Sequence, residues 1–118
     1  MTTFNEIVTY DFKPVRKGDT TNNVAFSLVD PAFPDGLVDA EIKMWLRNPP
    51  NLKPVKEFTS ENGGIVVTNA PLGQFSLVPY VCELPPCKYQ YDIQITYPDE
   101  TVKTRFQGSY TVKDDITK

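Results

Sequence analysis

Apolar and polar residues alternate almost without error from residue 89 to residue 112, with one short interruption. Before the interruption, one face carries Tyr89, Tyr91, Ile93, Ile95 and Tyr97. After Pro98-Asp99-Glu100 the same pattern resumes in Val102, Thr104, Phe106, Gly108, Tyr110 and Val112. A period of two over this length is typical of a half-buried antiparallel hairpin, and this hairpin constrains the fold more than any other feature.

The rest of the chain is divided by eleven prolines into short intervals. Proline cannot donate to a sheet ladder, so we expect these positions in loops, at edges or at strand ends. Strand-like patterns fill the intervals, for example "NNVAFSLVD", "DAEIKMWLR", "GGIVVTN" and "GQFSLVP". A helix over residues 38–47 is the one competitor, but alternation fits this segment better and Asn48-Pro49-Pro50 leaves no helical C-cap. About seven or eight strands predict a single antiparallel β-sandwich.

The shared period also predicts the core, because alternate residues of consecutive strands face the same layer. The expected core residues are Phe26, Leu28, Ile42, Met44, Leu46, Phe75, Leu77, Tyr91, Ile93, Ile95, Phe106 and Tyr110.

Length, charge and the distribution of apolar residues narrow the classes of function that we expect for this chain. A length of 118 residues fits one domain, with residues 10–118 as the sandwich and residues 1–9 as either an amino-terminal extension or a first strand. The net charge is −3 and the Lys and Arg residues are scattered, so we expect no nucleic-acid partner. Short apolar runs predict no membrane span, and the amino terminus lacks the pattern of a signal peptide, which predicts synthesis in the cytoplasm.

Histidine is absent, which removes the usual general base and the commonest neutral metal ligand. We therefore expect no enzyme, no metal and no cofactor. Cys82 and Cys87 frame the loop "CELPPC". They are two small buried or loop residues, or they form a disulfide across the Pro-Pro loop; free thiols in the cell are the expectation, since cytosolic thiols stay reduced.

Trp45 falls on the odd-numbered, polar face of "DAEIKMWLR". A Trp there marks a sugar-binding platform or a protein contact, or it is covered on both sides or lies against Lys or Arg stems. Strand patterning explains most of the tyrosines.

Several segments in order resemble a family of small bacteriophage virion proteins: "DFKPVRKGDT" leading into "VAFSLVD", then "LVDAEIKMWLR", "NGGIVV", "GQFSL" and the closing hairpin up to "DDIT". The resemblance covers residues 10–117. It implies an Ig-like β-sandwich similar to the amino-terminal domain of baseplate upper proteins, which attaches receptor-binding machinery to the tail. Because the sequence ends directly after the sandwich, an adaptor or decoration role is expected.

The expected function is thus a non-catalytic structural protein of the virion, present in many copies in a symmetric assembly with other virion proteins. The alternative is a carbohydrate-binding module that uses Trp45 and loop tyrosines. For partner contact, we single out Phe4, Ile7 and Val8 together with Trp45, since the amino-terminal segment is too apolar for a freely solvated tail.

Overall fold

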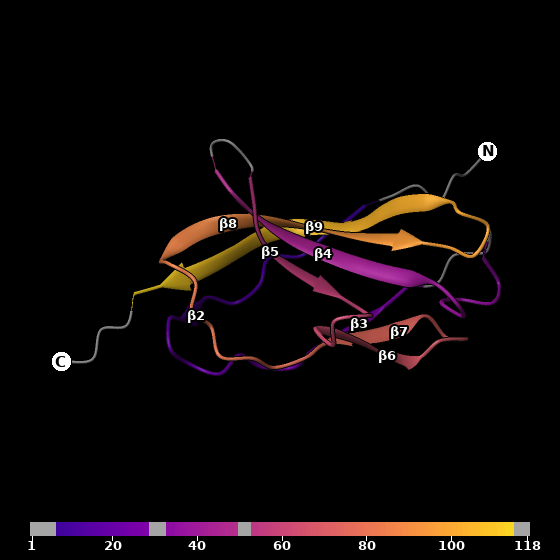
Figure 1. Ribbon diagram of the computed structural model, residues 1–118, viewed down its shortest axis with the longest axis horizontal. Coiled ribbons are helices and arrows are strands. Elements are labelled where there is room, and N and C mark those ends of the chain that lie inside the picture. The colour runs from indigo at the N-terminus through magenta and orange to yellow at the C-terminus, as the bar shows by residue number, and fades with distance from the viewer. Residues whose placement is uncertain (1–6, 29–32, 50–52, 115–118) are drawn as a thin grey trace.

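The computed structural model describes residues 7–28, 33–49 and 53–114, which form nine strands and no helix (Figure 1). Nothing in these residues has the length and apolar character of a membrane-crossing helix. The strands are β1 (Val8–Thr9), β2 (Val15–Arg16), β3 (Val24–Ser27), β4 (Glu41–Asn48), β5 (Lys53–Thr59), β6 (Ile65–Asn69), β7 (Gln74–Leu77), β8 (Cys87–Thr96) and β9 (Val102–Lys113). The all-β prediction is confirmed, and most of the segment that competed as a helix lies in strand β4.

Two sheets lie face to face in Figure 1. The large sheet has the order β1-β9-β8-β4-β5, with β2 also paired to β9, and the small sheet has the order β3-β7-β6. In Ig-like terms, β3, β7 and β6 correspond to strands B, E and D, and β9, β8, β4 and β5 to strands G, F, C and C′. The chain therefore folds as the expected Ig-like β-sandwich. Its first two strands depart from the antiparallel prediction, because β1 and β2 both run parallel to β9.

The β8–β9 hairpin closes through a tight turn over residues 97–101. Tyr97 N–H donates to the Thr101 carbonyl at 2.8 Å, and Glu100 N–H donates back to the Tyr97 carbonyl at 2.8 Å. Glu100 takes a positive φ of 69°, and the Asp99 carboxylate accepts the Thr101 N–H at 2.9 Å. The local polar side chain thus satisfies a backbone donor that the turn leaves unpaired.

One part of the prediction for the hairpin is wrong, namely the face on which the first residues of β9 lie. The β8–β9 register shifts between Ile93 and Gln94, so that Ile93 pairs with Phe106 while Gln94 pairs with Thr104. Such a β-bulge turns the following side chains to the opposite face. Val102 and Thr104 therefore leave the core face on which alternation placed them, and Val102 is 53% exposed. The side chains of Arg105 and Phe106 are both buried at the bulge.

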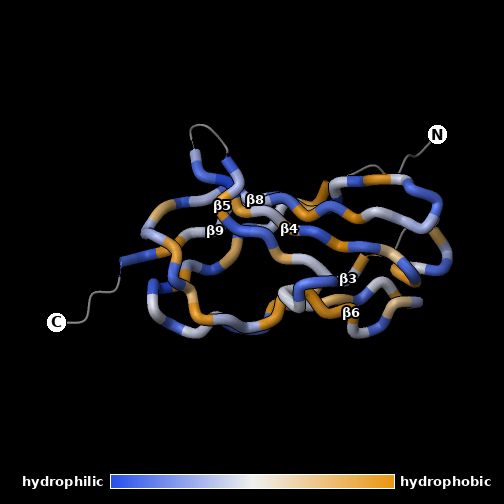
Figure 2. The backbone as a smooth tube through the Cα atoms, viewed as in Figure 1, coloured by the Kyte–Doolittle hydropathy of each residue, from blue (hydrophilic) through white to orange (hydrophobic). Residues whose placement is uncertain are grey.

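The core lies between the two sheets. Eleven of the twelve predicted core residues are buried, and Leu28 is half-buried at the end of β3. Phe26 stacks on Phe75 within the small sheet at 5.1 Å between ring centroids and meets Phe106 of the large sheet at 5.0 Å. In Figure 2 hydrophobic and hydrophilic residues follow each other along β4, as expected of a strand with one buried face.

Pro54 illustrates the proline rule. It lies in β5, which is an edge strand, and faces Arg47 beyond a register shift in the β4–β5 pairing. An edge strand tolerates proline because its missing N–H is not needed by a second neighbour.

Candidate interaction surfaces

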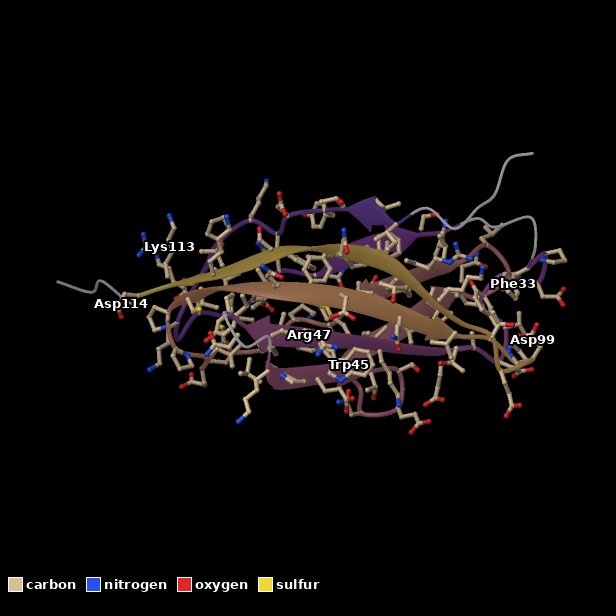
Figure 3. All side chains as sticks on the ribbon, turned by 90° about the horizontal axis from the view of Figure 1, so that it is seen from above. Phe33, Trp45, Arg47, Asp99, Lys113 and Asp114 are labelled. Carbon is tan, nitrogen blue, oxygen red and sulfur yellow. The ribbon has the colours of Figure 1, made fainter. Side chains whose placement is uncertain are left out.

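Trp45 lies in the middle of the face of the large sheet that points away from the small sheet (Figure 3). We call this the outer face. Its neighbours in register are Glu57 on β5 and Asp92 on β8, and Asp92 in turn pairs with Gln107 on β9. The row across the sheet is thus polar on both sides of a half-buried Trp45.

Arg47 covers Trp45. Its guanidinium carbon lies 5.5 Å from the centroid of the Trp45 ring, and its Nε donates to Asp92 Oδ1 at 2.9 Å. Both charged side chains remain partly exposed, so the ion pair contributes about 0–1 kcal/mol and the cation–π contact a similar amount. Of the environments expected for Trp45, the structure shows the one in which the ring lies against an arginine side chain.

A sugar-binding platform needs further exposed aromatic rings near Trp45. Within the described residues no ring pair includes Trp45, and four of the six tyrosines are buried: Tyr89, Tyr91, Tyr97 and Tyr110. These four tyrosines therefore supply core packing. On the outer face, the aromatic surface that Trp45 offers to a sugar is one partly covered indole ring.

The amino-terminal edge is the second surface. Val8 and Thr9 of β1 pair in register with Phe106 and Gln107 of β9. Ile7 is 43% exposed and Val8 is 49% exposed. Phe4, the third apolar residue of this segment, lies outside the described residues. The edge thus presents two aliphatic side chains beside a two-residue strand.

The segment after β1 is hydrogen-bonded to β9 of the large sheet and packs against its core face. Tyr10 N–H donates to the Gln107 carbonyl at 2.9 Å, and Phe12 N–H donates to the Ser109 carbonyl at 3.0 Å. The Phe12 ring is buried against Tyr91 and Tyr110, with centroids 4.8 and 5.0 Å apart. Sequence reasoning missed Phe12 as a core residue, although its place in the β-rich "EIVTYDF" was a signal.

The Cys82–Cys87 loop is held by a hydrogen bond from Tyr89, which follows it in β8. The Tyr89 hydroxyl donates to the Pro85 carbonyl at 2.6 Å, which is the tyrosine corner of Ig-like folds at the start of strand F. Both cysteines are free thiols; Cys82 is buried, and the half-buried Cys87 places Sγ 3.4 Å from Asn48 Oδ1. No group of three or more His, Cys, Asp or Glu in the described part of the chain is arranged to hold a metal ion.

The tyrosine hydroxyls serve as hydrogen-bonding groups in the folded protein. Burial raises the pKa of Tyr110 to about 12 and also raises the pKa of Tyr80 and Tyr91 above the ordinary value. Tyr80 and Tyr110 share a hydrogen bond between their hydroxyls. Because all three stay protonated near neutral pH, these groups stabilise the interior and offer no base to a substrate.

A third surface lies at the end of the sandwich where β8 turns into β9. A cavity of about 350 Å³ opens between this turn and the loop before β4, and it is lined by residues including Phe33, Asp35, Val38, Asp39, Tyr97 and Asp99. We call it the end cavity. Phe33 stacks on Tyr97 with ring centroids 3.6 Å apart. Sequence reasoning missed this site, because its residues come from two loops that are distant in the chain.

The loop beside the end cavity is held by its own backbone. Gly36 N–H donates to the Phe33 carbonyl at 2.9 Å, and Leu37 N–H donates to the Ala70 carbonyl at 2.8 Å. A Cβ at Gly36 would lie 2.3 Å from the Ala70 oxygen, so glycine permits this close approach. These contacts fix the backbone of the loop that forms one wall of the end cavity.

No protein-family model matches the sequence, and no curated protein matches it. Among solved structures the chain is similar to "Drosophila OTK, extracellular domains 3-5", at 13% identity and a TM-score of 0.39. The similarity covers 94% of this chain and 34% of that one, so the chain spans about a third of that structure. A likeness at this distance carries no argument about function.

Proposed function

We propose that the protein is a non-catalytic structural module of a bacteriophage virion, which joins other virion proteins as an adaptor or decoration of the tail, baseplate or head. The order of motifs over residues 10–117 supports this role through its resemblance to tail- and baseplate-associated proteins. The single observation that carries the proposal is the amino-terminal edge, where Ile7, just before β1, and Val8, its first residue, expose aliphatic side chains.

An edge of this kind suits attachment to a neighbouring subunit. Within the described residues β1 pairs with β9 alone, so the far side of β1 presents unpaired N–H and C=O groups. A strand from a neighbour satisfies such groups and covers the apolar side chains next to them. Burying the exposed halves of Ile7 and Val8 contributes about 1 kcal/mol each, and many copies in one particle multiply a modest affinity.

Charge substitution at the edge tests the attachment. In the double variant Ile7→Lys/Val8→Lys the side chains stay in water, so the thermal midpoint changes by no more than about 2 °C while incorporation into purified particles falls at least tenfold. Val55→Lys/Val66→Lys is the matched control, since Val55 is 42% exposed on β5, Val66 is 47% exposed on β6 and the pair adds the same charge as the double variant. Mass spectrometry of purified particles measures incorporation. Failure to find the polypeptide in particles, or normal incorporation of the double variant, overturns the proposal.

Deleting residues 1–9 addresses the two interpretations of this segment. The deletion removes β1 but leaves the hydrogen bonds of Tyr10 and Phe12 to β9. If the segment is a docking arm, the truncated protein keeps its thermal midpoint and no longer enters particles. If the segment is an internal strand that the sandwich needs, the truncated protein unfolds.

A further inference from the structure

The charged side chains are unevenly distributed along the 53 Å long axis of the molecule. The end near the β8–β9 turn carries an excess of carboxylates, and Figure 3 shows Asp99 there together with Phe33. We call it the acidic end. The carboxylates near this end are Asp35, Asp39, Glu41, Glu61, Asp99 and Glu100. The exposed or half-buried cations among them are Lys43 and Lys103.

The opposite end carries an excess of cations, and Figure 3 shows Lys113 there. Its exposed basic residues are Lys13, Arg16, Lys17, Lys53, Lys88 and Lys113, with the acidic residues Asp11, Asp19, Glu83 and Asp114 among them. Arg16 and Lys113 are direct partners across the β2–β9 pairing, and like charges placed opposite each other destabilise a sheet. The Arg16 guanidinium donates to the backbone carbonyl of Asp114 at 3.3 Å. We call this the basic end.

The end cavity suits the side chains of the basic end. Phe33 and Val38 give it apolar walls, and the exposed carboxylates of Asp35, Asp39 and Asp99 lie around it. A lysine or arginine places its aliphatic stem against such walls and its charged group beside the carboxylates. Hydrogen bonding by Thr101 lowers the pKa of Asp99, so this carboxylate is ionised at neutral pH.

Apolar side chains beside the charges add to the contact. Val38, which lines the end cavity, is 39% exposed. Leu72 is 58% exposed in the neighbouring loop, which the Leu37–Ala70 hydrogen bond joins to the loop of Val38. At the basic end Val81 is 53% exposed. Each end therefore combines an excess of one charge with a small apolar area.

From this charge complementarity we propose that the chain associates head to tail with a second copy of itself, with the basic end of one copy seated on the end cavity of the next. The Lys17 and Lys113 side chains of one copy occupy the end cavity of the next copy, and Arg16 contacts the rim of that cavity. Because the two contacting surfaces differ, such an interface is heterologous and builds a closed ring or an open filament. Exposed ion pairs are individually weak and are screened by salt, so the association is salt-sensitive.

Sedimentation analysis of the purified chain tests the proposal. At an ionic strength of about 20 mM the average mass increases with protein concentration, and at about 0.5 M the association constant falls at least tenfold. The acidic-end variant Asp35→Lys/Asp39→Asn and the basic-end variant Lys17→Glu/Lys113→Glu are each monomeric. Asparagine is used at position 39 because Asp39 has a positive φ of 59° that asparagine also tolerates.

Mixing these two variants gives the decisive result. Each retains the end that the other has lost, so an equimolar mixture forms dimers and nothing larger. Glu57→Lys/Gln107→Lys is the matched control, since it changes the net charge by the same amount as the acidic-end variant on the outer face, and it associates like the unmodified chain. The proposal is overturned if the unmodified chain stays monomeric at low salt, if either end variant still associates, or if the mixture stays monomeric. These outcomes concern the purified chain, so they are separate from the presence of the protein in particles.

Discussion

The hydroxyl of Tyr91 donates a hydrogen bond of 2.6 Å to the backbone carbonyl of Tyr10, a residue 81 positions earlier in the chain. Tyr91 pairs in register with Gly108, and a Cβ on Gly108 would lie 2.1 Å from the same Tyr10 oxygen. The amino-terminal segment, which runs alongside β9, therefore approaches it closely where glycine leaves space and where β8 supplies a donor. This contact links the candidate attachment edge to the core.

Replacing Tyr91 by Phe removes this hydrogen bond and keeps the ring. We expect the free energy of unfolding to fall by about 1–2 kcal/mol, because the part-buried Tyr10 carbonyl loses its side-chain donor. Tyr10→Phe is the control, since it leaves the Tyr10 carbonyl in place. Chemical denaturation measures both variants, and equal losses in the two would contradict the role of this bond.

Gly108→Ala should destabilise the protein by about 1–3 kcal/mol, because the added methyl group displaces the Tyr10 carbonyl. Gly63→Ala serves as a comparison and should cost less: its φ of 84° also strains an alanine, but a Cβ there meets no atom within 4 Å. A double-mutant cycle sharpens the test. Tyr91→Phe should cost less in the Gly108→Ala background, because both changes act on one carbonyl, and additive effects would rule this out.

Ile93→Ala should lower the free energy of unfolding by about 2–5 kcal/mol through lost burial and a cavity, since Ile93 is 1% exposed at the centre of β8. Val102→Ala, at a position that is 53% exposed, should change it by less than about 0.5 kcal/mol. If the two variants lose similar stability, the β-bulge that separates their faces is misplaced.

Stability should fall as the pH rises above about 10. Unfolded tyrosines titrate near pH 10, whereas burial raises the pKa of Tyr110 to about 12 and raises that of Tyr80 and Tyr91. The unfolded chain therefore loses protons first, and each such tyrosine removes up to about 1.4 kcal/mol per pH unit between its unfolded and folded pKa values. Denaturation midpoints at pH 9, 10 and 11 measure the slope, which Tyr110→Phe should reduce. An unchanged slope in that variant would exclude Tyr110 as a contributor.

The two thiols should differ in reactivity. In the native protein Cys87 should react with a thiol reagent much faster than Cys82, because Cys82 is fully buried. Cys87→Ser should remove the fast reaction. Protein prepared without reductant should show two reactive thiols per chain when it is denatured and titrated. The absence of any reactive thiol under those conditions would demonstrate a disulfide.

Much of the sandwich could be predicted from local patterns. Alternation in β8 identified Tyr91, Ile93 and Ile95 as core residues, because a strand with one buried face must bury every second side chain. Proline positions separated the strands, because proline cannot take part in a central ladder. The competing helix over residues 38–47 was rejected correctly by the same reasoning.

Only the tertiary structure decided the features that depend on pairing between distant segments. The bulge between Ile93 and Gln94 moves Val102 to the outer face. A bulge is an extra residue in one strand relative to its partner, so the sequence of either strand alone does not reveal it. The parallel pairing of β1 with β9, the burial of Phe12 and the stacking of Phe33 on Tyr97 at the end cavity also join residues far apart in the chain. Side-chain period reports which face of a strand is apolar, whereas register and loop contacts depend on the partner that each strand meets in space.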